Sequence, residues 1–165
     1  MSRPLVAILM GSDSDWPTFE ASAKALEEFG VAYDVRVLSA HRTPGPLLRY
    51  VAQAGRRGVQ VFIAGAGGAA HLAGVVAAHT TQPVIGVPVE TKLMSGLDSL
   101  LSTVQMPRGI PVATVAIGNG YNAALLAVQI LAVHNAALQK RLSAHKRTLA
   151  TKVLKADRGL QSKLR

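Results

Sequence analysis

The residues with the clearest capacity for chemistry are His41 and Arg42, an ionisable imidazole beside a fixed cation, with the hydroxyl group of Ser39 close by in the sequence. Residues 31–38 precede them and alternate apolar and polar side chains, a pattern that is typical of a β-strand. Pro44 follows, and its fixed φ angle suits the first turn of a helix. His41 is therefore predicted to lie in a loop between a strand and a helix, where parallel α/β sheets bind their ligands.

A second polar loop follows residues 4–10, whose continuous apolar run indicates a buried strand. Ser12, Asp13 and Asp15 lie in this loop, and Pro17 opens a predicted helix. Serine and aspartate are preferred at helix N-caps, and their oxygen atoms also bind phosphate or sugar hydroxyl groups. The spacing leaves both roles, capping and ligand binding, open for these three residues and for Ser14 between them.

A third loop, residues 65–71, is rich in glycine and alanine and follows a predicted strand at 59–64. Small residues at such a position allow a ligand to approach the backbone closely. His71 ends this loop, and two interpretations of it stay open. It is either a functional residue of the loop or a cap for the helix that begins near Ala70.

The third loop also supports a rival hypothesis. Gly65, Gly67 and Ala70 match the pattern G-x-G-x-x-G/A of dinucleotide-binding proteins, and Glu90 follows the next strand roughly where a ribose-binding acid is needed. That fingerprint normally follows the first strand of its unit, however, and a dinucleotide would leave the other two loops without a role. No lysine of the P-loop type follows a glycine loop, which disfavours ATP chemistry.

Strands and helices alternate along the chain, which predicts a parallel sheet with right-handed crossovers and helices on both faces. Five strands favour a three-layer, flavodoxin-like α/β fold with the strand order 2-1-3-4-5, followed by a C-terminal helical arm. That order places the loops after the first and third strands together at the switch point of the sheet. The remaining predicted elements are helices at about 17–29, 44–57, 96–103 and from 121 onward, and strands at 83–88 and 111–117.

The composition indicates one domain without thiol chemistry. The chain has 165 residues, of which 49% are hydrophobic, enough to bury a substantial core. It contains no cysteine, so neither a disulfide nor a cysteine-ligated metal is available. No signal pattern precedes the first strand, and no apolar run approaches the ~20 residues that cross a bilayer. We therefore expect a cytoplasmic protein without membrane association.

The net charge of +9 belongs almost entirely to the tail of the chain. Residues 1–139 hold nine Lys or Arg against eight Asp or Glu, whereas residues 140–165 hold nine Lys or Arg against Asp157 alone. Gly159 is predicted to end the regular helix of this tail early. An apolar stripe crosses the basic helix and consists of Leu138, Leu142, Leu149, Val153, Leu160 and Leu164.

A basic amphipathic helix of this kind can bind a membrane or RNA. The stripe carries neither Trp nor Phe, which favours packing on a neighbouring subunit or on the body of the same chain. We therefore expect residues 1–134 to form the α/β domain. Residues 135–165 are expected to form a basic amphipathic tail that belongs to the same domain or packs on a neighbouring subunit, with nucleic-acid binding disfavoured.

Four segments of the sequence together resemble the class I PurE family, the 5-(carboxyamino)imidazole ribonucleotide mutases of purine biosynthesis. The segments are MGSDSDWP at 10–17, SAHRTP at 39–44, IAGAGGAAHL at 63–72 and DSLLSTVQMP at 98–107. The residues at 41–44 and 67–71 resemble those of the mutases rather than those of the class II carboxylases. The class II enzymes use free carbon dioxide and have a lysine after the histidine. Departures from the family pattern are Ala73, where a proline is common, and a short turn at 118–122.

The resemblance implies an enzyme that moves a carboxylate from the exocyclic nitrogen of an imidazole ribonucleotide to ring carbon four, without ATP, metal or another cofactor. It implies His41 as the catalytic base, since imidazole takes up and releases protons near neutral pH. Arg42 and Ser12 are implied to bind the phosphate, and Asp15 the ribose. The implied substrate-binding residues are Ser12, Asp13, Asp15, Ser39, Ala40, Arg42, Gly67, His71 and Leu72.

The resemblance also implies a quaternary structure and a role for the backbone. The amides of residues 67–72 are implied to bind the base and the transferred carboxylate. Members of the family assemble into homo-octamers with active sites where subunits meet, and the apolar tail stripe is consistent with such an assembly. Class II-type carboxylation and, less favoured, dinucleotide binding stay as alternatives.

Overall fold

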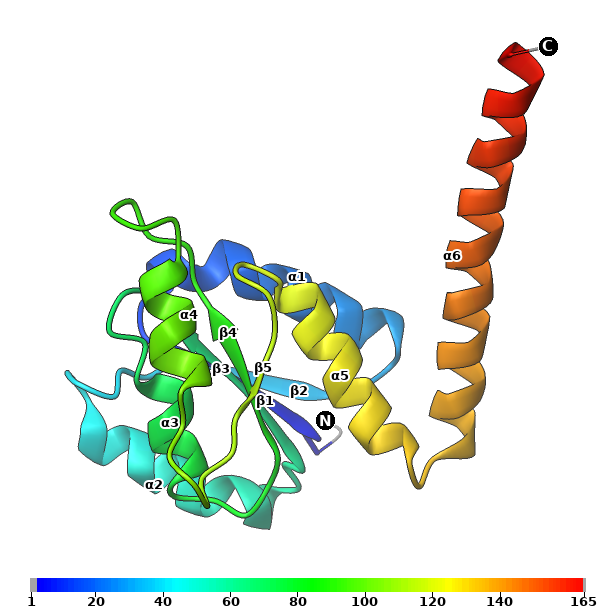
Figure 1. Ribbon diagram of the computed structural model, residues 1–165. Helices are drawn as coiled ribbons and strands as arrows, with labels where there is room; N and C mark the ends of the chain where they lie inside the picture. The colour runs from blue at the N-terminus through cyan, green and yellow to red at the C-terminus, as the bar shows by residue number, and fades with distance from the viewer. Residues whose placement is uncertain (1–2, 165) are drawn as a thin grey trace.

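The computed structural model describes residues 3–164 and contains a five-stranded, all-parallel sheet with the order β2-β1-β3-β4-β5 (Figure 1). The predicted flavodoxin-like order is therefore confirmed. β1 lies between β2 and β3 and pairs with both. The strands are β1 Val6–Met10, β2 Tyr33–Val37, β3 Val61–Ala66, β4 Val84–Pro88 and β5 Ala113–Thr114.

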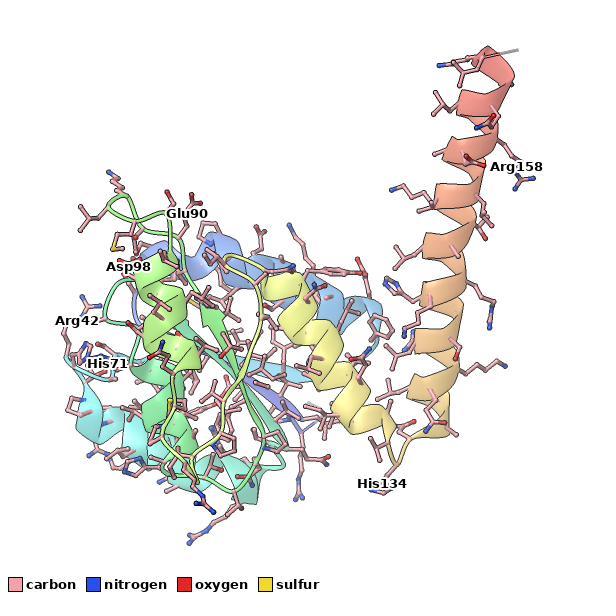
Figure 2. All side chains as sticks on the ribbon, viewed as in Figure 1. Arg42, His71, Glu90, Asp98, His134 and Arg158 are labelled. Carbon is pink, nitrogen blue, oxygen red and sulfur yellow. The ribbon has the colours of Figure 1, made fainter. Side chains whose placement is uncertain are left out.

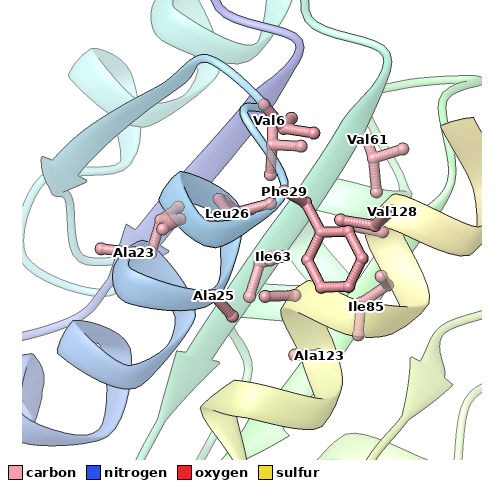
Figure 3. Close-up of a cluster of buried hydrophobic side chains, with 14 of the residues drawn as sticks. Val6, Ala23, Ala25, Leu26, Phe29, Val61, Ile63, Ile85, Ala123 and Val128 are labelled. Atoms are coloured by element: carbon pink, nitrogen blue, oxygen red, sulfur yellow. The ribbon is translucent and has the colours of Figure 1, made fainter. Parts of the chain in front are cut away.

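Helices cover both faces of the sheet, so the central strands are buried on both sides. Along β1, Val6 and Ile8 pack into one cluster, whereas Ala7 and Leu9 pack into the other. This alternation explains why the strand sequences are continuously apolar. α1 (Trp16–Glu28) and α5 (Gly120–Ala132) cover the first face, whose side chains Figure 3 shows around Phe29, and α2 (Pro44–Ala54) and α3 (Leu72–Ala77) cover the second.

α1 and α5 pack unusually closely at Gly120. A Cβ atom on Gly120 would overlap the carbonyl oxygen of Thr18, so this contact requires glycine. The buried hydroxyl of Ser22 donates a 2.7 Å hydrogen bond to the Gly120 carbonyl at the same place. Gly30, which was predicted to stop the first helix, has φ +65° and does so.

The fifth strand is much shorter than the predicted 111–117. Only Ala113 and Thr114 pair with β4, opposite Ile85 and Gly86. β5 lies at the edge of the sheet, and Pro111 has no amide hydrogen to extend the ladder. The apolar run at 111–117 therefore continues as irregular backbone, and α4 (Leu97–Val104) precedes it.

The tail forms one long helix, α6 (Ala136–Lys163), which projects away from the body (Figure 1). The prediction that Gly159 ends it early is wrong, because helix-forming neighbours continue the helix through this residue. Arg141 anchors its first turns by donating a 2.7 Å hydrogen bond to the carbonyl of Phe29.

The apolar stripe of α6 packs on the body only at its start, where Leu138 is buried and Leu142 is partly buried against the core. Packing of the whole stripe on the body of the same chain is therefore wrong. Within residues 3–164, no helix has both the length and the hydropathy to cross a membrane. The large apolar side chains left exposed on α6 are Leu149, Val153, Leu154 and Leu160, and the exposed Leu164 follows the helix directly.

Candidate active site

The register of the sheet brings the three predicted loops together. Met10, the last residue of β1, lies opposite Val37 of β2 and Gly65 of β3. Because the strands are parallel, the loops that follow them leave the same edge of the sheet. The chemistry-bearing residues of all three loops therefore gather at one place.

A cavity of about 380 Å³ lies between these loops. Eight of the ten predicted site residues line it, namely Ser12, Asp15, Ser39, Ala40, His41, Arg42, Gly67 and Leu72. Four further residues of the same loops line the cavity without having been predicted as individual site residues, although the amide of Ala69 belongs to the implied stretch 67–72: Gly11, Ser14, Ala66 and Ala69. Asp13 and His71 do not line the cavity.

The first loop satisfies its own backbone and still presents side chains to the cavity. Ser12 caps a short 3-10 helix through its hydroxyl, and Asp15 completes a capping box by accepting from the Ser12 amide at 3.3 Å. Asp13 is exposed and accepts a 3.1 Å hydrogen bond from the Ser14 amide. Ser12 and Asp15 thus cap the short helix and also line the cavity, whereas Asp13 hydrogen-bonds within the loop and does not line it.

Asp15 is the half-buried acid of the cavity. Burial raises the pKa of its carboxyl group above the ordinary value of 3.8, against the opposing effects of the hydrogen bonds from Ser12 and Ser14 and of the positive charge of Arg42. The carboxyl group therefore holds its proton more tightly than a free aspartate does. Its position suits hydrogen bonding to ligand hydroxyl groups.

The second loop is folded around Ser39. The Ser39 hydroxyl accepts hydrogen bonds from the amides of His41 and Arg42 at 3.3 and 3.1 Å, and this geometry turns both side chains out of the strand. Arg42 reaches across to the first loop, where its guanidinium donates a 2.6 Å hydrogen bond to the carbonyl of Gly11. A fixed cation thus borders the cavity that Ser12 lines from the other side.

The most informative contact of the site joins two histidines that are 30 residues apart in the sequence. Nε2 of His41 lies 2.8 Å from Nδ1 of His71, with the rings nearly perpendicular. One ring must donate an N–H and the other must accept. His71 occupies the N-cap position of α3, but its side chain forms no capping hydrogen bond, so the capping interpretation is wrong. Figure 2 shows His71 beside Arg42 at this edge of the molecule.

The glycine loop and the start of α3 use only some of their backbone amides in hydrogen bonds within the protein. Its amides at Ala70 and His71 donate to carbonyls within the loop, and the Gly68 amide donates to a serine of α4. Within residues 3–164, no hydrogen-bond partner is found for the amides of Gly67, Ala69 and Leu72, and all three residues line the cavity. These amides can therefore donate hydrogen bonds to anionic oxygen atoms of a ligand.

The dinucleotide hypothesis fails on the placement of its first glycine. Gly65 is buried inside β3, where a Cβ atom would overlap the carbonyl oxygen of Val87, so this glycine serves packing between strands. Glu90 lies in the segment after β4 and does not line the cavity. In the part of the chain that the structure describes, no three His, Asp or Glu side chains gather as they would around a metal ion.

The sequence model of AIR carboxylase matches residues 5–152, which is most of the chain. The chain belongs to the AIR carboxylase family. A relative from Synechocystis sp. is 59% identical over 151 residues, which cover 92% of this chain and 86% of the relative. That relative is an N5-carboxyaminoimidazole ribonucleotide mutase.

Two further family members complete the comparison. The crystal structure of Treponema denticola PurE matches with a TM-score of 0.86 and 31% identity, and the match covers 94% of this chain and 97% of that chain. A phosphoribosylaminoimidazole carboxylase from Candida glabrata is 58% identical over 133 residues, which cover 81% of this chain and 23% of the relative. The family thus includes relatives that are named for two related activities.

Proposed function

We propose that this protein is an N5-carboxyaminoimidazole ribonucleotide mutase of purine biosynthesis, which produces 4-carboxy-5-aminoimidazole ribonucleotide without ATP or another cofactor. The observation that carries the proposal is the hydrogen-bonded pair of His41 and His71 at a cavity with one cation and free backbone amides. The name of the 59% identical relative supports the same reaction.

The cavity offers a different group for each part of the nucleotide. Arg42 supplies the positive charge and Ser12 the hydroxyl that a phosphate needs. Asp15 accepts hydrogen bonds from the ribose hydroxyls, while Ser39 and Ala40 shape the wall between them. The free amides of the glycine loop then hold the carboxylate that is transferred.

His41 supplies the proton transfers that the isomerisation requires. As the bond between the exocyclic nitrogen and the carboxylate breaks, His41 donates a proton to that nitrogen and carbon dioxide is released into the cavity. Ring carbon four attacks the carbon dioxide, and His41 then removes the proton from that carbon. The His71 ring accepts the N–H of His41 whenever His41 carries the extra proton. The two steps leave the enzyme unchanged.

Containment of carbon dioxide requires a cover that one chain does not provide. His41, Arg42 and His71 are all exposed in the single chain, whereas freed carbon dioxide must be kept from the solvent. A second copy of the chain is the natural cover, since α4 also exposes Leu97, Leu101 and Val104 along one face. We therefore include a homo-oligomer, an octamer by resemblance, in the proposal, with residues 135–165 as its arm.

A carboxylase that uses free carbon dioxide is the second candidate, because the Candida glabrata relative carries that name. The deciding experiment follows the carbamate nucleotide spectroscopically in bicarbonate-free buffer. A mutase converts it completely, whereas a carboxylase turns over only aminoimidazole ribonucleotide with added bicarbonate. Tight binding of NAD without turnover of either nucleotide would contradict both candidates.

A further inference from the structure

The segment DSLLSTVQMP at 98–107 holds none of the residues that line the cavity. It forms most of α4, and among residues 3–164 the cavity-lining set includes no residue of this helix. Two of its serines nevertheless face the glycine loop. Ser99 is completely buried and Ser102 is partly buried. A buried hydroxyl group requires a structural reason, because burial without hydrogen bonds is costly.

Ser99 joins three segments through one hydroxyl group. Its Oγ donates a 2.7 Å hydrogen bond to the carbonyl of Val89 and accepts a 2.9 Å hydrogen bond from the amide of Gly68. Ser102 contacts the other side of the same peptide, since its Oγ lies 3.2 Å from the Gly68 carbonyl and 2.7 Å from the Asp98 carbonyl. Both polar groups of Gly68 are thus held by α4.

The start of α4 is held in place by hydrogen bonds to the segment that follows β4. Thr91 donates a 2.8 Å hydrogen bond to the side chain of Asp98, and its hydroxyl also accepts from the Gly96 amide at 3.3 Å. Figure 2 shows Asp98 near Glu90 at this end of the helix. Gly96 begins the helix with φ +88°, and a Cβ atom there would press on Ile117 at 2.5 Å.

The position of Gly68 controls the position of the second imidazole. Gly68 has φ +71°, its carbonyl accepts a 2.8 Å hydrogen bond from the Ala70 amide, and His71 follows directly. The His71 ring then meets Nε2 of His41 at 2.8 Å. We infer that Ser99 is a positioning residue of this active site: its buried hydroxyl fixes the glycine loop to α4 and thereby aligns His71 with His41.

This inference rests on the proposed function for its kinetic prediction but not for its structural one. The Ser99→Ala variant leaves the Gly68 amide without its acceptor, so the loop shifts while the phosphate and ribose contacts of the first two loops stay. We expect kcat to fall about tenfold to a hundredfold, because small displacements of aligned groups have effects of that order. KM for the nucleotide should change by less than about threefold.

Ser22→Ala provides a matched control. Ser22 is also a completely buried serine whose hydroxyl donates a 2.7 Å hydrogen bond to a backbone carbonyl, that of Gly120, but it lies between α1 and α5. Both variants therefore lose a hydrogen bond from a buried hydroxyl group to a backbone carbonyl. Ser99→Ala also loses the bond accepted from the Gly68 amide, so it should lose at least as much thermal stability as Ser22→Ala. Only Ser99→Ala should lose kcat.

Hydrogen–deuterium exchange of the full-length protein, followed by mass spectrometry, tests the positioning independently of turnover. The peptide that contains residues 66–71 should exchange faster in Ser99→Ala than in the wild type and Ser22→Ala. Unchanged exchange there, unchanged kcat, or an equal loss of kcat in Ser22→Ala would overturn the inference. Failure of the wild type to convert the carbamate nucleotide would instead overturn the proposed function, and the exchange result would still decide whether Ser99 holds the loop.

If Ser99→Ala does not fold, the inference is tested with Ser102→Ala instead. It removes the contact to the Gly68 carbonyl from a partly buried position, so folding is less at risk. We expect the same direction of change with a smaller amplitude, about threefold in kcat. Wild-type exchange of residues 66–71 together with wild-type kcat in this variant would overturn the inference.

Discussion

The cavity loops and the outer half of α6 differ in where their side chains find partners. In the loops, polar groups from separate strands meet within one chain, as Arg42 does with Gly11 at 2.6 Å. On α6, Leu149 is 50% exposed and Val153 is 69% exposed. The difference indicates that one chain brings the polar groups of the cavity together by itself but leaves apolar surface for another molecule to cover.

Among the cavity loops, the largest effect is expected when the imidazole of His41, the proposed proton carrier, is removed. His41→Asn should keep nucleotide binding but lower kcat by at least ~10²-fold to 10⁴-fold, which is the usual contribution of an acid–base group. Steady-state kinetics and calorimetry measure the two quantities separately. A variant that retains more than about a tenth of the wild-type rate would remove His41 from its proposed role.

Removal of the cation should weaken binding more than chemistry. Arg42→Ala loses a charge-assisted contact to the phosphate, so the nucleotide Kd should rise by about one to two orders of magnitude. Arg56→Ala is the control, since it removes the same charge from an exposed position after α2. Calorimetry that shows equal Kd values for the wild type and Arg42→Ala would place the phosphate elsewhere.

The α6 side of the comparison is tested with charges on opposite faces of the helix. Glutamate at both Leu149 and Val153 should shift the assembly toward smaller species at low concentration, because it abolishes apolar burial worth about 25 cal/mol per Å². Glutamate at both Thr148 and Thr151 adds the same charge to the other face and should leave the mass unchanged. Light scattering at several dilutions measures both.

The outcome for α6 also separates its possible partners. If nucleic acid covers the helix, both glutamate pairs should weaken a salt-dependent affinity for RNA while the mass of the assembly stays constant. That result would contradict the proposed packing between copies of the chain.

The smallest expected effect is a pH dependence of stability that comes from Asp15. Folding raises the pKa of this carboxyl group, so its contribution favours the folded state below pH 3.8 and is lost as the pH rises through the raised pKa. Asp15→Asn never ionises and escapes that loss. The Tm of this variant relative to the wild type should therefore increase as the pH rises from below 3.8 through the raised pKa of Asp15, by less than about 4 °C. A Tm difference that does not change with pH would mean that burial does not raise the pKa of Asp15.

The sequence predicted the elements of the site better than the contacts within it. Apolar runs followed by polar loops revealed three strand ends, and the order 2-1-3-4-5 placed them together. The contact between His41 and His71 was beyond such reasoning, because it depends on the turn at Gly68. The role of Ser99 was equally hidden, since a serine in a helix gives no local signal of the loop it touches.

The two errors of secondary structure have local causes. The predicted strand at 111–117 pairs only at Ala113 and Thr114, because an edge strand has a neighbour on one side and its apolar pattern does not reveal that. Gly159 costs the helix about 1 kcal/mol relative to alanine, but the surrounding residues favour helix and α6 continues. In both places the neighbourhood of the residue decided the structure.

The position of all the cavity-lining residues in the first half of the chain has a consequence for synthesis of the protein. Every cavity-lining residue of the described chain lies between Gly11 and Leu72, so the catalytic segment leaves the ribosome before β4 and α5 do. The apolar face of the sheet that carries Val61 and Ile63 of β3 is fully covered only when α5 docks beside α1 with Val128 and its neighbours. A nascent chain with a complete set of catalytic residues is therefore still a chain with an open core, and a chaperone would meet it in that state.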